Sequence, residues 1–153
     1  MNKKVYLTIS WMAVFFWMSF IFSLSSQPAF ESNELSLGIA DRIIKLFGNL
    51  FRFDIDILNH IVRKGAHSIA YLILAVLIFN YVNQRKISGW KSVVLVLSLC
   101  VLYAISDEIH QLYVEGRSGQ PSDVLIDSIG AVAGVGVFKL LQRLFSSILH
   151  RKK

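Results

Sequence analysis

Residues 102–134 read LYAISDEIHQLYVEGRSGQPSDVLIDSIGAVAG and place a polar turn between two apolar segments. Apolar residues continue past the adjacent acids Asp107 and Glu108, so we expect a single helix to contain both of them. Gly116 and Pro121 then predict a turn, after which the apolar pattern of a second helix begins. An ionised carboxylate near the centre of a bilayer costs roughly 2.5–3.5 kcal/mol. The acids therefore indicate a buried polar cluster, unless the first helix ends before them and they are solvated.

The rest of the chain contains further apolar stretches of membrane-spanning length. Of its 153 residues, 54% are hydrophobic and 17% are charged, whereas charged residues make up about 25% of soluble domains. We expect transmembrane helices at about 5–24, 66–82, 92–111 and 124–141. The first is longer than the apolar core of a signal peptide, so we expect it to remain as an anchor. The sequence thus predicts an all-α integral membrane protein with one domain over residues 1–153.

A long polar segment separates the first two expected spans. Apolar residues recur in it at helical spacing, at Ile39, Ile43, Leu46, Phe47 and Leu50. With charged residues on the opposite face, this pattern predicts an amphipathic helix over about 37–52 that lies in the membrane interface. Such a helix either covers an outer pocket as a lid or simply fills a long connection.

The basic residues are distributed unevenly between the ends of the expected helices. Ten of the 16 Lys and Arg residues fall in the N-terminus, in the loop after the second span and in the C-terminal tail. The acidic residues all fall on the other side or in the helix ends that face it. The positive-inside bias therefore predicts a multi-pass protein with both termini in the cytoplasm. The net charge of +6 then reflects topology, and no nucleic-acid partner is expected.

Three of the expected spans carry polar side chains toward the outer side. They are Lys64, His67 and Tyr71 on the second helix, Asp107, Glu108, His110 and Gln111 on the third, and Asp123 and Asp127 on the fourth, with Lys64 and Asp123 just outside the apolar spans. Residues three or four apart share a helix face, so most members of each group form a stripe. Plainer interpretations fit the same residues. Lys64 can extend its charged end to the interface, Asp123 can cap its helix, and polar pairs can simply join helices.

Arg117 lies in the turn between the third and fourth spans, with carboxylates on both sides of it in the sequence. Its planar guanidinium matches carboxylate and phosphate groups alike, so it predicts either a salt bridge or a phosphate clamp. In the fourth span, Asp127, Gly130 and Gly134 share one stripe, which favours a close helix contact. We therefore expect the polar stripes to meet in one outward-facing cavity.

Two chemistries fit such a cavity. Its histidines and acids suit a divalent metal, although their spacing matches no strong metal motif, and the identity of any metal ligand stays open. Alternatively, they act as general acids and bases while Arg117 holds an anionic headgroup. The candidate catalytic residues are His67, Asp107, Glu108 and His110. The candidate binding residues are Lys64, Tyr71, Gln111, Arg117, Asp123 and Asp127.

Several of these motifs resemble the VanZ-like family of membrane proteins. They are FSLSSQP at the end of the first span, KGAHSIAYLIL in the second, and SDEIHQLYVEGRSGQPSDVLID, followed by GAVAG, across the third and fourth. The family pattern marks Lys64, His67, Tyr71, Asp107, Glu108, His110, Gln111, Arg117, Asp123, Gly130 and Gly134. Many relatives carry asparagine at the position of Asp127, which implies a hydrogen-bonding role there. The resemblance implies a protein of the bacterial cytoplasmic membrane, and the family's namesake is associated with resistance to teicoplanin.

Functions from three classes are compatible with these features. One is the binding of an anionic membrane lipid or lipid-linked envelope component, with a link to glycopeptide resistance. Another is a membrane-embedded hydrolase or transferase that acts on a lipid headgroup or lipid-linked precursor. A third is a small transporter subunit, which would use the polar cluster as a proton relay and would need to form homo-oligomers. A cluster that only joins the helices is a structural alternative.

Overall fold

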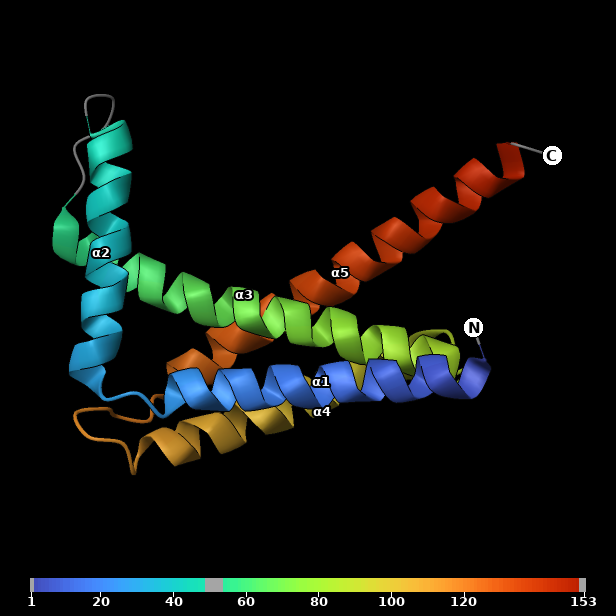
Figure 1. Ribbon diagram of the computed structural model, residues 1–153, viewed down its shortest axis with the longest axis horizontal. Coiled ribbons are helices and arrows are strands. Elements are labelled where there is room, and N and C mark those ends of the chain that lie inside the picture. The colour runs from blue at the N-terminus through green and yellow to red at the C-terminus, as the bar shows by residue number, and fades with distance from the viewer. Residues whose placement is uncertain (1, 49–53, 152–153) are drawn as a thin grey trace.

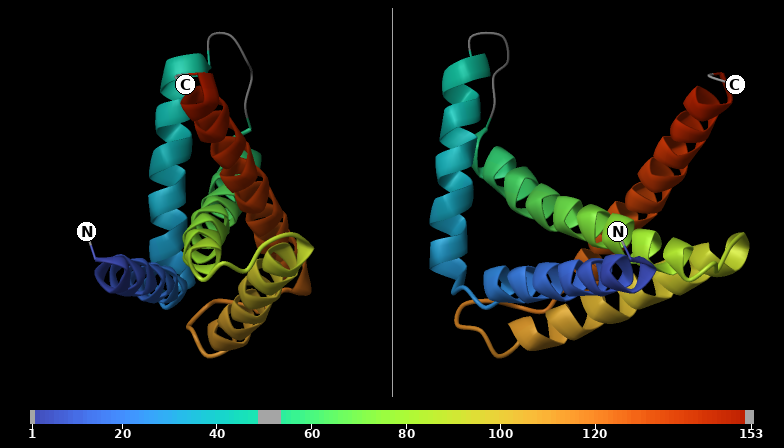
Figure 2. Two further views of the ribbon diagram at one scale, coloured as in Figure 1. Left: turned by 90° about the vertical axis from the view of Figure 1, so that its right-hand side faces the viewer. Right: turned by 45° about the vertical axis from the view of Figure 1, so that its right-hand side comes forward.

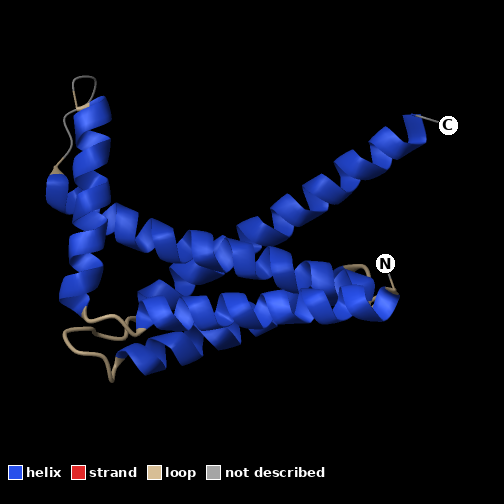
Figure 3. Ribbon diagram, in the orientation of Figure 1, coloured by secondary structure: helices blue, strands red, loops and turns tan. Residues whose placement is uncertain are grey.

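The described part of the chain folds into helices and connecting turns (Figures 1 and 3). The computed structural model describes residues 2–48 and 54–151. Its helices are α1 (Lys3–Ser25), α2 (Ala29–Phe47), α3 (Ile55–Gln84), α4 (Trp90–Gln111) and α5 (Pro121–Arg151). These residues contain no strand, and the predicted all-α class is confirmed.

Four of these helices are long and apolar enough to cross a membrane. They are α1, α3, α4 and the part of α5 that runs from Pro121 to Leu144. α4 continues to Gln111, as expected, and both Asp107 and Glu108 are buried within it. The alternative in which the helix ends before these acids is therefore wrong.

α3 is much longer than its apolar part because its polar first turn is capped. The helix begins at Ile55, ahead of the expected membrane span of about 66–82. The side chain of Asp54 accepts hydrogen bonds from the backbone N–H groups of Asp56 (2.9 Å) and Ile57 (3.3 Å). These bonds satisfy donors that a helix start leaves without partners. The extension carries polar turns of α3 beyond the apolar span, where they pack against α2.

α2 is the helix expected between the first two spans, but it starts before the expected range of about 37–52. Pro28 precedes it, and the backbone N–H of Ala29 donates to the carbonyl of Glu115 (3.1 Å). Contact with the turn before α5 therefore sets where α2 begins, while the end of the expected range lies outside the described residues. Much of the described apolar stripe of α2 is exposed, with Leu46 at 74% and Ile39 and Phe47 at 49% each, while Ile43 is half-buried. This exposure agrees with an interfacial helix, and that location remains a prediction.

α1, α3 and α4 run lengthwise together, α5 crosses them, and α2 stands across the end of α1 (Figures 1 and 2). The α1–α2 and α4–α5 turns meet at one end of this bundle. The N-terminus and the α3–α4 turn lie at the other end. The polar motifs of the sequence, although far apart along the chain, are thereby collected at a single end of the molecule.

Small residues let α3 and α5 approach closely. A Cβ atom on Gly130 would collide with the backbone carbonyl of Ser68, and one on Gly134 would collide with that of Leu72. The close contact predicted from the glycine stripe is therefore confirmed. It also brings Asp127, one turn earlier on α5, beside α3.

Candidate functional site

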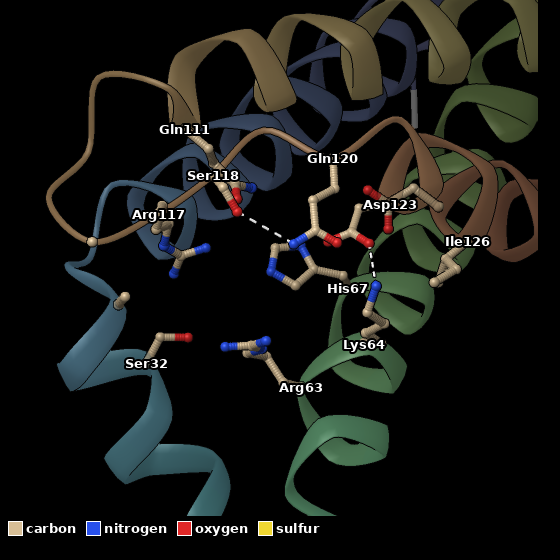
Figure 4. Close-up of a pocket in the computed structure, with 13 residues that line it drawn as sticks. Ser32, Arg63, Lys64, His67, Gln111, Arg117, Ser118, Gln120, Asp123 and Ile126 are labelled. Atoms are coloured by element: carbon tan, nitrogen blue, oxygen red, sulfur yellow. Dashed lines mark hydrogen bonds and ion pairs between the residues drawn. The ribbon is translucent and has the colours of Figure 1, made fainter. Parts of the chain in front are cut away.

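A polar cavity of about 170 Å³ lies where the α4–α5 turn, α2 and α3 meet (Figure 4). Its polar lining consists of Ser32 from α2, Arg63, Lys64 and His67 from α3, Gln111 from α4, Arg117, Ser118 and Gln120 from the turn, and Asp123 and Asp127 from α5. Six of the candidate site residues are among them. The other four candidates, Tyr71, Asp107, Glu108 and His110, do not line the cavity.

An ion pair between Lys64 and Asp123 forms one side of the cavity (Figure 4). The Lys64 side chain is 19% exposed, so the charge lies in a largely enclosed place. Asp123 is in the first turn of α5, where the helix dipole favours a negative charge. The charge of Lys64 is thus compensated within the protein, and the cationic groups left to meet a ligand are arginines.

Arg117 is held on the other side of the cavity by the end of α1. Its Nε donates a hydrogen bond to the carbonyl of Gln27 (2.8 Å), and its Nη2 donates to that of Leu24 (3.2 Å). Burial and the nearby charge of Arg63 lower the pKa of Arg117, but an arginine stays protonated at neutral pH. Arg117 makes no salt bridge within the described part of the chain. Of the two predicted roles, the salt bridge is not formed among the described residues, and the phosphate clamp remains a prediction.

Arg63 is a lining residue that the sequence interpretation missed. It extends from α3 toward the same space as Arg117 and Ser32 (Figure 4). No other described residue forms a hydrogen bond or an ion pair with its guanidinium. Arg63 lies four residues before His67, a spacing that puts both on one helix face. This spacing is the sequence signal for Arg63, whereas the stripe through Lys64, His67 and Tyr71 does not include it.

A second, larger cavity of about 270 Å³ adjoins the polar one between α1, α2 and α3. Its lining is mainly apolar and includes Ile21, Leu35 and Val62. Four residues line both cavities, namely Ser32, Arg63, His67 and Arg117. The polar and apolar cavities therefore share a wall, and that wall carries both arginines.

Asp107, Asp127 and Tyr71 form a buried polar group between α3, α4 and α5, in which the two carboxyl groups lie close enough to act on each other and on the Tyr71 hydroxyl. The hydroxyl of Ser25 donates to Asp107 Oδ2 (2.7 Å), which ties α1 to α4. Asp107 Oδ1, both carboxyl oxygens of Asp127 and the Tyr71 hydroxyl have no partner among the described residues. Buried polar atoms are nearly always hydrogen bonded, so this group, which includes the cavity residue Asp127, indicates a functional region.

Glu108 and His110, two of the candidate catalytic residues, face other parts of the protein. Glu108 Oε2 accepts a hydrogen bond from the backbone N–H of Gln120 (2.8 Å), which anchors the turn before α5. Nε2 of His110 lies 3.0 Å from Ser26 Oγ, and the His110 ring stacks on Phe22 with centroids 4.2 Å apart. Because the turn and α1 cover the helix faces that carry these residues, their contacts support positioning roles.

Comparison with known protein families gives a match over most of the chain. A family model described as VanZ/LLP1 matches residues 10–142, a range that includes every residue of both cavities. The chain belongs to the VanZ/LLP1 family. The resemblance of its motifs to VanZ-like proteins is thereby confirmed. No curated protein and no solved structure matches the chain.

The candidate metal ligands of this VanZ/LLP1 chain are not gathered at one point. Among the described residues, no three His, Cys, Asp or Glu side chains are arranged to hold a metal ion. The cause lies in α4, where Glu108 contacts the turn and His110 contacts α1, while Asp107 is directed toward Ser25. The cavity presents arginines, one histidine and a buried carboxyl group to a ligand. This arrangement does not support a divalent-metal centre.

Proposed function

We propose that this VanZ/LLP1 protein binds an amphiphile with an anionic headgroup, such as a membrane lipid or a lipid-linked envelope component. The observation that carries the proposal is the pair of adjoining cavities, one polar and one apolar, whose shared wall contains Arg63 and Arg117. The headgroup would contact the two guanidinium groups. The attached hydrocarbon chain would occupy the space between α1, α2 and α3.

The arginines favour an anion because neither forms a salt bridge or a hydrogen bond with a carboxylate of the described residues, although Asp107 and Glu108 act on Arg117 from beyond salt-bridge distance. Arg117 donates its hydrogen bonds to neutral carbonyls, and Arg63 makes none within the described part of the chain. Lys64, by contrast, is paired with Asp123. A planar guanidinium binds phosphate or carboxylate through two parallel hydrogen bonds, which supplies orientation as well as affinity.

The apolar cavity determines which ligand shapes fit and contributes little to the binding affinity. A hydrocarbon chain that leaves the bilayer gains little free energy from burial, because lipid tails are as apolar as the side chains that replace them. Selection among lipids therefore depends on the headgroup. The width of the apolar space is set by α2, which is joined to α3 through Ser36 Oγ to Asn59 Oδ1 (2.5 Å) and Asn59 Nδ2 to Asn33 Oδ1 (2.7 Å).

The charge distribution supports a cavity that opens to the outer leaflet of the bacterial cytoplasmic membrane. Most basic residues lie near the N-terminus, the α3–α4 turn and the C-terminal tail. Positive-inside bias assigns these segments to the cytoplasm. The end of the bundle that carries the cavity is opposite to the N-terminus and to that turn (Figure 1).

Lipid binding by the purified protein tests the proposed function. Native mass spectrometry would compare anionic with zwitterionic lipids for wild type and for Arg117→Gln. Wild type should bind the anionic lipids saturably, and Arg117→Gln should weaken this binding about tenfold, because a charge-assisted hydrogen bond contributes roughly 1.5–3 kcal/mol. Arg85→Gln, at the opposite end of α3, is the matched control and should bind as wild type does. Unchanged binding in Arg117→Gln would contradict the proposal.

A second candidate function is an enzyme that acts on the bound headgroup. The observation that favours it is His67, which lines both cavities and lies within electrostatic range of Asp107. A histidine in that position can transfer protons at the headgroup while the carboxyl group orients it. Incubation with lipids and lipid-linked precursors, followed by mass spectrometry, should then give a product that Asp107→Asn fails to make. Binding without any product would leave the first function standing alone.

A link to teicoplanin resistance is a further proposal, which rests on the family and on the proposed ligand class. An envelope lipid held by this protein would change what a lipoglycopeptide meets at the membrane surface. The test compares teicoplanin susceptibility in cells that express wild type, Arg117→Gln or neither. Equal susceptibility in all three would reject the link without affecting the binding proposal.

A further inference from the structure

We propose that the headgroup held by Arg63 and Arg117 is a terminal phosphate monoester, so that the ligand is a lipid phosphate without any further headgroup. This inference rests on the proposed function, the binding of an anionic amphiphile, and names the ligand class. Phosphatidic acid and polyprenyl phosphates belong to this class. Phosphatidylglycerol, whose phosphate is a diester, does not.

The first argument is the position of the charges around the cavity. Arg63, Arg117 and Ser32 lie on one side of it, while Lys64 and Asp123 lie together on the other (Figure 4). Neither arginine is hydrogen bonded to a carboxylate of the described residues. The cavity is thus divided into a compensated side and a side with two cationic groups.

Two neighbouring guanidinium groups favour a ligand with two negative charges. The charge of Arg63 acts on Arg117 more strongly than the opposing charge of either Asp107 or Glu108, and like charges repel. A phosphate monoester carries a charge of about −1.5 to −2 at neutral pH. It therefore offsets both arginines, whereas a phosphodiester carries about one charge and leaves part of the repulsion uncompensated.

Neutral donors beside the arginines match the oxygens of a monoester. The hydroxyl groups of Ser32 and Ser118 and the imidazole of His67 line the same cavity. A phosphate monoester presents three terminal oxygens that are strong acceptors, and a diester presents two. The donor set of this cavity is thus sufficient for the larger number of acceptors.

The turn before α5 bounds the polar cavity where it meets the start of α2. It contacts the start of α2 through the hydrogen bond from Ala29 N to Glu115 O (3.1 Å). Gly116 has a φ of +71°, and a Cβ atom there would lie 3.1 Å from the Ala29 side chain. The polar space of about 170 Å³ suits a compact headgroup such as a phosphate.

The adjoining apolar cavity identifies the source of the phosphate as a lipid. A free phosphate ion would use the arginine side of the polar cavity and nothing else. The shared wall at Arg63 and Arg117 instead continues into apolar space of about 270 Å³. A lipid phosphate would fill both cavities at once, with its ester oxygen near the shared wall.

A lipid competition experiment on the full chain tests the inference. The protein would be placed in phosphatidylcholine nanodiscs with equal fractions of phosphatidic acid or phosphatidylglycerol, and in a second pair with polyprenyl phosphate or polyprenol. Native mass spectrometry would measure occupancy. Phosphatidic acid should bind about tenfold more tightly than phosphatidylglycerol, a difference of about 1.4 kcal/mol. Polyprenyl phosphate should likewise bind more tightly than polyprenol.

Variants of Arg63 connect that preference to the cavity. Arg63→Gln should remove most of the tenfold preference, and Arg63→Lys, which keeps the charge but not the planar fork, should retain part of it. Arg85→Gln should keep the full preference. Thermal unfolding of each variant would show that the loss is not a loss of fold.

The outcomes separate this inference from the proposed function. Equal binding of phosphatidic acid and phosphatidylglycerol, both above phosphatidylcholine, would overturn the monoester inference and leave anionic-lipid binding intact. Failure of every anionic lipid to bind would overturn both. A preference that survives in Arg63→Gln would overturn the assignment to Arg63. Displacement of phosphatidic acid by inorganic phosphate at similar concentration would show that the ligand is a free ion.

Discussion

Tyr71 and Tyr103 lie beside each other, with ring centroids 6.1 Å apart, but their hydroxyl groups have different surroundings. The Tyr103 hydroxyl donates to the carbonyl of Met18 (2.6 Å) and so joins α4 to α1. The Tyr71 hydroxyl is buried without a partner among the described residues, in the group that contains Asp107 and Asp127. One tyrosine thus serves the fold, whereas the other retains a polar group that the fold does not use.

Removal of each hydroxyl should change stability in opposite directions. Tyr71→Phe should raise the free energy of unfolding by about 1 kcal/mol, because it deletes a buried polar group without a partner. Tyr103→Phe should lower it by about 1 kcal/mol, because it deletes a hydrogen bond and leaves a carbonyl unsatisfied. Thermal unfolding in detergent measures both. If Tyr71→Phe destabilises the protein as Tyr103→Phe does, the Tyr71 hydroxyl has a structural partner and is not held for a ligand.

At the scale of elements, the contact between α3 and α5 determines which side chains meet in the site. Gly130 of α5 meets the Ser68 carbonyl of α3, whereas Gly136, two turns further along α5, has nothing within 4 Å of the place where a Cβ would lie. The approach at Gly130 brings Asp127 into the cavity that α3 lines with His67. With alanine or another small residue in place of Gly130, the same two helices would still form, but they would not approach as closely.

Gly130→Ala and Gly136→Ala form a matched pair that tests this contact. Gly130→Ala should lower the free energy of unfolding by about 1–3 kcal/mol, the usual cost of overpacking a close contact. Gly136→Ala should leave it unchanged or raise it by up to about 1 kcal/mol, since alanine is the better helix former. Chemical or thermal unfolding of the purified variants provides the measurement. Equal effects of the two substitutions would contradict the close α3–α5 contact.

At the scale of the whole molecule, the bundle has two chemically different ends. The α1–α2 and α4–α5 turns and the polar cavity share one end, while the N-terminus and the α3–α4 turn occupy the other (Figure 1). Charge bias predicts that the cavity end faces away from the cytoplasm. The leaflet from which a lipid ligand enters depends on this orientation.

Cysteine labelling in intact cells tests the orientation. The native Cys100 is fully buried, so a membrane-impermeant maleimide should not reach it. Glu34→Cys, exposed on α2, should react in intact cells, and Ser88→Cys, exposed in the α3–α4 turn, should react only after permeabilisation. The reverse pattern would place the cavity on the cytoplasmic side and would change the source of the proposed lipid.

The sequence by itself determined the class of the protein, the four apolar spans and the helix in which Asp107 and Glu108 are buried. These features follow from hydrophobic length and periodicity, which are local properties of a chain in a bilayer. The family pattern likewise marked Lys64, His67 and Arg117, which the structure brings to one cavity.

Only the tertiary structure decided which polar residues share a space. It directed Glu108 to the turn and His110 to α1, and it brought Arg63 and Arg117 together in the wall that the polar cavity shares with an apolar one. Helical periodicity shows which residues occupy one face, but the neighbour that covers this face depends on how the other helices pack. In this protein, two contacts determine which polar residues share the cavity. They are the close crossing of α3 and α5 and the contact of the turn with α2.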